Sequence, residues 1–215
     1  MAVVRLAKAS DLSATSHIAF RGFSLSPWNR FYRPFSASFP QDVENSYLRE
    51  QQEALGNRKK LFTVVETEPG VGGARQVVGF AIWNYAPQQQ RESEPVIVKL
   101  TNDQDRSVDP YRANVLFGAT ESAVEKCLKG HMELDNMAVD PTHFRKGYGT
   151  LLCRHGMNIA EEDKVPVGIV AAALGMKLYE TLGFSCSVKV ELTDGRPDKE
   201  ASVNFWIQKW DATST

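Results

Sequence analysis

Residues 131–150, HMELDNMAVDPTHFRKGYGT, contain the pattern that decides the fold of this chain. They read as a strand, a polar turn and a basic glycine loop that opens directly into an amphipathic helix. A glycine loop in front of a helix presents successive backbone N–H groups and forms an anion site. Gly147 and Gly149 lack Cβ atoms, so a phosphate can approach the backbone closely and a positive φ is allowed. Because Arg145 and Lys146 add positive charge, the pattern predicts a ligand that carries a diphosphate.

Two common nucleotide motifs fit this loop poorly. A Walker loop needs G-x-x-x-x-G-K-[ST], which is absent from the sequence. A dinucleotide fingerprint needs a third glycine, but Leu152 stands three residues after Gly149. That fingerprint is also expected near the start of a domain, whereas this loop lies two-thirds of the way along the chain.

A second motif makes the pattern specific. The segment Leu178–Phe184, LYETLGF, resembles the L-Y-E-x-x-G-F helix ending of the GCN5-related N-acetyltransferases, or GNAT superfamily. The loop resembles the [Q/R]-x-x-G-x-[G/A] pattern of that superfamily, and the two motifs occur in the right order at about the right separation. The resemblance covers roughly residues 131–190. Phe144 departs from it, since it stands where the family usually has Gln or Arg.

The resemblance implies that acetyl-CoA is the cosubstrate and assigns residues to it. The strand segment would pair its backbone with the pantetheine arm, through Met137, Ala138 and Val139. The loop would hold the diphosphate, through Arg145, Lys146, Gly147, Tyr148, Gly149 and Thr150. Ala172 stands where the family often has an Asn that contacts the coenzyme, which leaves one contact in doubt.

Tyr179 resembles the tyrosine that the family places near the coenzyme sulfur. A phenol is neutral at pH 7 and can donate a proton to the leaving thiolate. The alternative is a structural tyrosine, half-buried against the sheet. Its position inside the Y-E-x-x-G-F pattern favours the catalytic role.

Glu133 and Asp135 are the candidates for the base that removes a proton from the attacking amine. In a regular strand they point to the same face, together with Met137. Two carboxylates on one face raise each other's pKa, which suits a base that works near neutral pH. Either could instead pair with a cation across the sheet or attract a cationic amine, and a water relay could replace both.

Length and composition favour one domain, residues 1–215, of an ordinary globular protein. The formal net charge of −1 supplies no field that would attract nucleic acid or an anionic membrane. No apolar run is long enough for a transmembrane helix, and the N-terminus lacks a signal peptide. Three cysteines and four histidines show no metal-ligand spacing, so no metal and a cytoplasmic location are expected. Homodimerisation is left open.

We expect an α/β fold of the GNAT type. A mixed, mostly antiparallel sheet of six or seven strands should carry helices on both faces. Strands are expected near residues 2–7, 61–65, 77–83, 131–139, 166–171, 185–192 and 201–210, and helices near 10–23, 41–55, 110–128, 149–163 and 173–182. Ser10 and Asp11 read as a helix N-cap. The motif strand and the strand near 166–171 should splay apart to open a central cleft for the coenzyme.

Two segments bear on the acceptor. Residues 86–130 interrupt the pattern and read either as an insertion near the acceptor end of the cleft or as a surface excursion. The aromatic segment 28–39 reads as core packing, an acceptor wall built from Trp28, Phe31 and Tyr32, or an RNA-stacking surface. We expect direct acetyl transfer from acetyl-CoA to the primary amine of a small molecule, such as an arylalkylamine or polyamine. The alternatives are a protein N-terminal or lysine acetyltransferase and a non-catalytic CoA-binding module.

Overall fold

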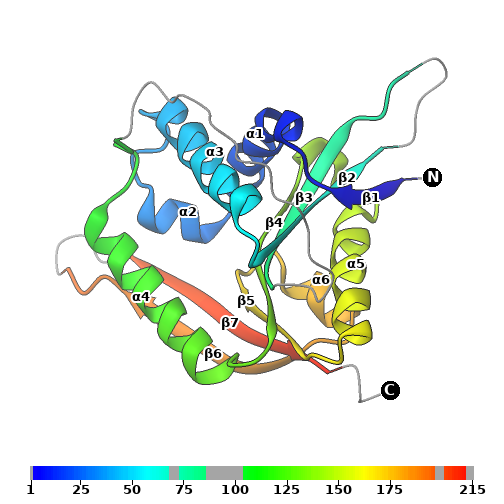
Figure 1. Cartoon of the computed structure of the whole chain (residues 1–215). Helices are drawn as coiled ribbons and strands as arrows, with labels where there is room; N and C mark the ends of the chain where they lie inside the picture. Colours follow the sequence, from blue (N-terminus) through cyan, green and yellow to red (C-terminus); the bar gives the residue numbers. More distant parts are fainter. Residues whose placement is uncertain (1, 68–72, 86–103, 197–200, 212–215) are drawn as a thin grey trace.

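The computed structural model describes residues 2–67, 73–85, 104–196 and 201–211 of the chain. Seven strands form one sheet in the order β1-β2-β3-β4-β5-β7-β6. Figure 1 shows this sheet with helices on both sides of it. The α/β fold and the mostly antiparallel sheet expected from the sequence are therefore confirmed, with seven strands.

The strands of the sheet are β1 (Val3–Leu6), β2 (Lys60–Glu66), β3 (Val77–Asn84), β4 (Met132–Val139), β5 (Val167–Ala171), β6 (Ser185–Thr193) and β7 (Ser202–Trp210). The inner strands β2, β3 and β5 have the apolar composition of buried sheet elements, whereas the edge strand β6 is largely exposed. β2 and β3 are buried along nearly their whole length because helices cover both of their faces. Every neighbouring pair is antiparallel except β4 and β5, which are parallel.

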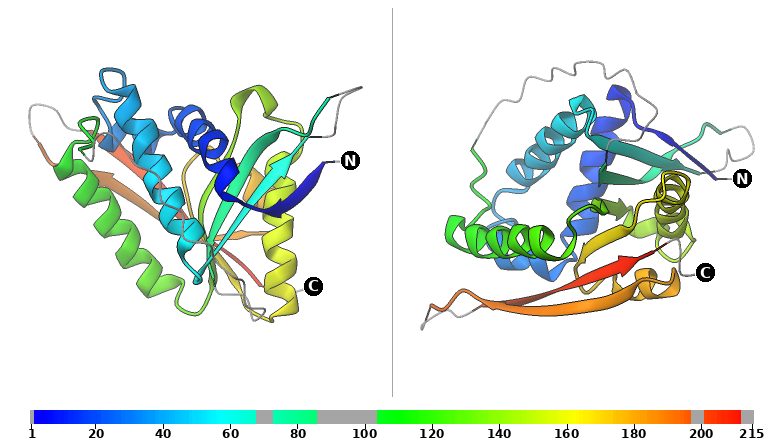
Figure 2. Two further views of the ribbon diagram at one scale, coloured as in Figure 1. Left: turned by 45° about the horizontal axis from the view of Figure 1, so that its top comes forward. Right: turned by 60° about the horizontal axis from the view of Figure 1, so that its bottom comes forward.

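The helices divide between the two faces of the sheet. On one face lie α1 (Leu12–Phe23), α2 (Pro27–Tyr32), α3 (Pro40–Gly56) and α4 (Pro110–Cys127). On the other lie α5 (Tyr148–Glu162) and α6 (Met176–Thr181). Both views in Figure 2 show the same division. The two faces therefore provide different surroundings for residues that alternate along one strand.

Three apolar clusters fill these layers. One lies between the sheet and α5 and α6 and contains Trp83, Leu134 and Leu152. On the opposite face, a second cluster packs α1 and α3 onto β2 and β3 around Phe80. A third packs α2 and α4 onto β7 around Phe205. The helices on this face thus cover the two halves of the sheet through separate apolar cores.

β4 and β5 pair over only three positions, and the last is Leu134 with Ile169. Beyond that row the strands separate, because β4 continues to Val139 while its pairing with β5 has ended. β4 also contains a bulge against β3. Asn136 pairs with Ile82 and Leu134 pairs with Trp83, so Asp135 is the extra residue. The predicted splay is therefore present, and the bulge lies directly beside its origin.

The described part of segment 86–130 is anchored to the rest of the protein. Asp109 caps α4 by accepting hydrogen bonds from the backbone N–H groups of Tyr111 and Arg112. Arg106 binds the Asp42 carboxylate at 2.7 Å, and Arg33 binds Asp105 at 2.5 Å. α4 is therefore tied to α2 and α3, while residues 86–103 lie outside the described residues.

Two local expectations hold only in part. Asp11 stands at the N-cap of α1, as expected, but its side chain does not cap that helix and instead accepts a hydrogen bond from the backbone N–H of Lys8. The helix expected over residues 173–182 begins only at Met176. The chain needs the residues between Ala171 and Gly175 to turn away from β5 before α6 can start.

Candidate active site

The glycine loop adopts the conformation that an anion site requires. Arg145 and Gly147 have positive φ values of 63° and 84°, and Gly147 is the N-cap of α5. A Cβ atom on Gly147 would meet nothing within 4 Å, so the space in front of it is open. The first N–H groups of a helix have no acceptor inside the helix, and they carry the positive end of its dipole. The loop thus fits a diphosphate.

Gly149 does not use the positive φ that the sequence allowed for it, because it lies inside the first turn of α5. A Cβ atom there would lie 3.1 Å from the Leu178 side chain of α6. The glycine therefore permits close packing between α5 and α6, which are the helices that carry the two motifs.

The edge of β4 that faces β5 is open from Asp135 to Val139. β5 pairs with β4 only as far as Leu134, and β3 occupies the opposite edge. The backbone of residues 135–139 can therefore accept a further extended chain on the β5 side. This is the segment, including Met137, Ala138 and Val139, that the resemblance assigns to the pantetheine arm.

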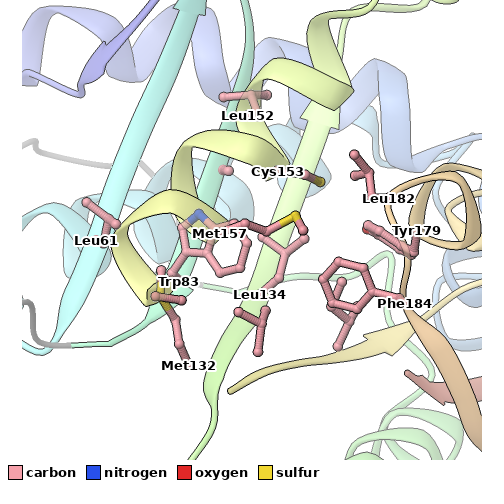
Figure 3. Packing of buried hydrophobic residues seen from close by; sticks show 14 of the residues in the cluster. Leu61, Trp83, Met132, Leu134, Leu152, Cys153, Met157, Tyr179, Leu182 and Phe184 are labelled. Carbon is pink, nitrogen blue, oxygen red and sulfur yellow. The ribbon is translucent and has the colours of Figure 1, made fainter. Parts of the chain in front are cut away.

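Tyr179 projects from α6 into the layer between the sheet and α5 (Figure 3). Its side chain is 7% exposed and lies 5.9 Å, centroid to centroid, from the ring of Phe184. Cys153 of α5 lies nearby, and its sulfur is 3.5 Å from that of Met137 on β4. The tyrosine is thus brought to the side of the splay that holds the open edge of β4.

The surroundings keep the Tyr179 phenol protonated. Burial raises the pKa of Tyr179 well above its usual value, and Cys153 adds to the shift. Among the described residues, no hydrogen bond occupies its hydroxyl group. A phenol of this kind is suited to donate a hydrogen bond to sulfur, and complete transfer of its proton is energetically uphill.

On the opposite face, the bulge changes which residues share a side. Met132 and Leu134 pack toward α5, and so does Met137 after the bulge. Ala138 packs toward α1 and α3, the side to which Glu133 points. The expectation that Met137 shares a face with Glu133 is therefore wrong, because the additional residue reverses the alternation.

Glu133 and Asp135 each have one polar partner. Asn84 donates a hydrogen bond of 3.0 Å to Glu133, and Lys60 binds Asp135 at 2.6 Å. Burial raises the pKa of Glu133 above its usual value, the hydrogen bond from Asn84 opposes the shift, and Asp135 adds to it. Both carboxylates lie beside the row at which β4 and β5 separate, which is where a base for the reaction is needed.

A third carboxylate, missed by sequence reasoning, joins this group from α3. The amide of Asn136, next to the bulge, donates a hydrogen bond to Glu50. Crowding by neighbouring protein atoms, and then the charge of Asp135, raises the pKa of Glu50 to about 7, although the residue keeps a side open to solvent. Glu50 is one of many charged residues on a polar helix, so its spacing carried no signal.

The aromatic segment expected at 28–39 serves mainly as core. Phe31 and Tyr32 are buried between α2, α4 and β7, and the Trp28 indole donates a hydrogen bond to the backbone of Asn204. Arg33 is also buried and stacks against Tyr32 and Tyr47. These rings therefore support the fold of the helical layer. Because Phe31 and Tyr32 are buried in the core, they do not form the wall of an acceptor site.

Within the ranges that the structure describes, no group of three or more His, Cys, Asp or Glu side chains is arranged to hold a metal ion. The same ranges contain no helix that is both long and apolar enough to cross a bilayer.

Comparisons with known proteins agree with this geometry. An acetyltransferase from the fungus Stachybotrys chartarum is 27% identical over 195 residues, which cover 89% of this chain and 84% of the relative. A mosquito arylalkylamine N-acetyltransferase like 5b has a similar structure, with a TM-score of 0.59, 18% identity and coverage of 98% of this chain and 100% of the other.

The PaiA N-acetyltransferase of Thermoplasma acidophilum, solved with coenzyme A, is similar with a TM-score of 0.55 and 12% identity. It matches over 98% of this chain and 99% of its own. The acetyltransferase (GNAT) family itself matches residues 28–184, which is more than half of the chain. Together with the splayed sheet and the glycine loop, this match shows that the chain belongs to the GNAT family and is an acetyl-CoA-dependent acetyltransferase.

Proposed function

We propose that the protein transfers an acetyl group from acetyl-CoA directly to the primary amine of a small molecule. The observation that carries this proposal is the position of Glu133 and Asp135 beside the row where β4 and β5 separate. Carboxylates there attract an alkylammonium ion and hold it where its proton can be removed. The open edge of β4 lies next to them on the same strand, so the two substrates meet across one strand.

The acetyl-CoA side of the reaction uses the chain in three places. The first-turn N–H groups behind Gly147, with Arg145 and Lys146, hold the diphosphate. The free backbone edge of residues 135–139 holds the extended arm and orients the thioester. Tyr179 donates a hydrogen bond to the sulfur as negative charge develops on it.

The acceptor side favours a cation over an anion. Glu133 and Asp135 contribute two carboxylates, and Lys60 offsets one of them. The formal net charge of −1 gives no long-range attraction for a polyanion. The likeness to solved structures at 12–18% identity concerns the fold, so the choice of a small amine rests on these residues.

The test is the rate of CoA release across a panel of acceptors. Small alkylamines, arylalkylamines and polyamines should give higher kcat/KM values than peptides with a free N-terminus or a lysine. A preference for peptides of more than about tenfold, equal to roughly 1.4 kcal/mol of transition-state stabilisation, would show a protein acetyltransferase instead. Tight acetyl-CoA binding without release above the hydrolysis rate for any acceptor would show a non-catalytic module.

A further inference from the structure

Glu50 is the carboxylate that the proposed reaction has not yet used. It comes from α3, one of the four helices on the side of the sheet to which Glu133 points, here called the acceptor face. It contacts Asn136 immediately after the bulge in β4. Asn136 pairs with Ile82 of β3 through its backbone, which fixes the position of its side chain. Glu50 is therefore held against the strand that carries both the open edge and Asp135.

Two apolar clusters pack the helices of the acceptor face onto the sheet. Phe80 and Ala138 belong to the cluster under α1 and α3, and Phe205 belongs to the cluster under α2 and α4. Glu133, Asp135 and Asn136 contribute polar side chains from β4, and Glu50 joins them from α3 through Asn136. These polar groups lie on β4 beside the row at which it separates from β5.

The charged groups around Glu50 come from three elements. Asp135 of β4 disfavours the ionised form of Glu50, whereas Lys60 of β2 and Arg33 of α2 favour it. Lys60 is shared, because it is bound to Asp135 at 2.6 Å, and Arg33 is bound to Asp105. Since both cations are already paired with other carboxylates, a proton or an ammonium ion is the natural further partner of Glu50.

We propose that Glu50 is the general base of the acetyl transfer, and that Asp135 and Lys60 are the positioning residues that set its basicity. In the reaction, the amine nitrogen forms its bond to the acetyl carbon and the carbon–sulfur bond breaks. Glu50 takes the proton that leaves nitrogen, and the sulfur leaves as a thiolate that accepts a hydrogen bond from Tyr179. Glu133, held by Asn84, then serves to bind the ammonium form.

This inference rests on the proposed function, and its geometry agrees with the chemistry required. A base is most effective when its pKa lies near the working pH. The pKa of Glu50 is raised to about 7, whereas Asp135 is engaged by an ammonium group from Lys60. Of the three carboxylates, Glu50 is thus the one best suited to exchange a proton near neutrality.

The experiment combines Glu50→Gln with a matched control on the same helix, Glu53→Gln, which changes an exposed carboxylate one turn later. Two acceptors are used at saturating acetyl-CoA. One is an alkylamine that is protonated at neutral pH, and the other is methoxyamine, which is largely unprotonated at that pH. E50Q should lower kcat/KM for the alkylamine by about 10²- to 10⁴-fold. For methoxyamine the loss should be less than about tenfold, since little proton removal is required before attack.

The pH profile gives a readout that a structural role would not move. The base must be deprotonated, so activity falls on the acidic side as Glu50 is protonated. Asp135→Asn removes a negative neighbour and should move the acidic limb to lower pH. Lys60→Met removes a positive neighbour and should move it to higher pH. E53Q should leave the limb in place.

Carbon-13 NMR of labelled glutamate side chains tests Glu50 without turnover, with the E50Q spectrum identifying its signal. We expect a midpoint near neutrality that falls in D135N. A midpoint in the ordinary range, about 4.3, overturns the role of Glu50 even if amines are acetylated. The role of Glu50 is also overturned if E50Q keeps kcat/KM for the alkylamine within about threefold of the wild type. It is overturned as well if E50Q lowers kcat/KM for both acceptors by the same factor. If the wild type acetylates neither amine, the proposed function itself fails, whatever the midpoint.

Discussion

Replacement of Gly156 by alanine tests how α5 is seated on the sheet. A Cβ atom at this position would lie 2.2 Å from Cζ2 of Trp83 and 2.4 Å from Cε2. Trp83 is completely buried and lies in β3, an inner strand of the sheet. The shorter distance falls about 1.2 Å below the 3.4 Å at which ordinary contacts begin, so either the indole or the helix must move.

The expected decrease in the free energy of unfolding is the difference between two opposing contributions. Overpacking of a core costs about 1–3 kcal/mol, and the rigid indole places Gly156→Ala at the upper end of that range. Alanine in a helix interior recovers about 0.5–1 kcal/mol relative to glycine. The net loss of about 2 kcal/mol corresponds to a fall in Tm of about 4–8 °C for a chain of this size.

Two further variants make the reasoning specific. Trp83→Phe removes the ring atoms that clash, together with an indole N–H that has no hydrogen-bond partner in the described structure. In that background G156A should cost nothing or should stabilise. Gly118→Ala, in α4, is the matched control because its Cβ atom would meet nothing within 4 Å, and it should raise stability slightly.

Thermal unfolding of the four proteins and of the double mutant provides the measurement. G156A should also weaken stabilisation by acetyl-CoA. Gly156 lies on the same helix as the glycine loop, about 10 Å beyond the loop along the helix axis, so a shift of the helix moves the loop as well. The argument is refuted if G156A unfolds at the wild-type temperature. It is equally refuted if G156A loses as much stability in the W83F background as in the wild type.

Two other predictions concern the coenzyme site. Gly147→Asp should abolish thermal stabilisation by acetyl-CoA because it adds a negative charge where the diphosphate belongs. Gly147→Ala bears only the backbone strain of a positive φ and should retain part of that stabilisation. Equal stabilisation of both folded variants would contradict the loop assignment. Tyr179→Phe should lower kcat by roughly 10- to 150-fold, the value of about 1.5–3 kcal/mol for a hydrogen bond to a charged group, with acetyl-CoA binding unchanged. Gly175→Ala should give a similar loss, because its Cβ atom would lie 2.5 Å from the Tyr179 ring and displace the hydroxyl, and full activity in G175A would argue against precise placement of the phenol.

The sequence could predict the elements around the glycine loop because their signals are local. Gly147 must adopt a positive φ, the helix after it shows an apolar periodicity, and the strand before it begins with alternating apolar and polar residues. The mostly antiparallel sheet, and the separation of β4 from β5, followed from the resemblance of two motifs. These features need no knowledge of residues that are distant in the chain.

The bulge at Asp135 could not be predicted in the same way. Alternation along a strand holds only while each residue opposes one partner, and nothing in the letters of β4 marks the extra residue. One unpaired residue was sufficient to reverse the side on which Met137 lies. Likewise, Glu50 and Asn136 are 86 residues apart, so their contact is a product of tertiary structure. The helical face that carries Glu50 gave no reason to prefer it over its charged neighbours.

The position of the bulge explains how one strand can serve two substrates. Without the extra residue, Met137 would point toward α3, and the apolar packing against Cys153 and α5 would be lost. With it, the strand presents two carboxylates and the Asn136 amide to the acceptor face around the bulge, and Met137 to the coenzyme face after it. The accumulated negative charge of Glu50, Glu133 and Asp135 is costly in the absence of a cation, since Lys60 can compensate only in part. Protonation of Glu50 relieves that cost in the free protein, and an incoming ammonium ion relieves it in the complex. Binding of the amine and preparation of the base are therefore coupled through the same charges, because the cation that binds also favours the ionised form of Glu50 that must receive its proton.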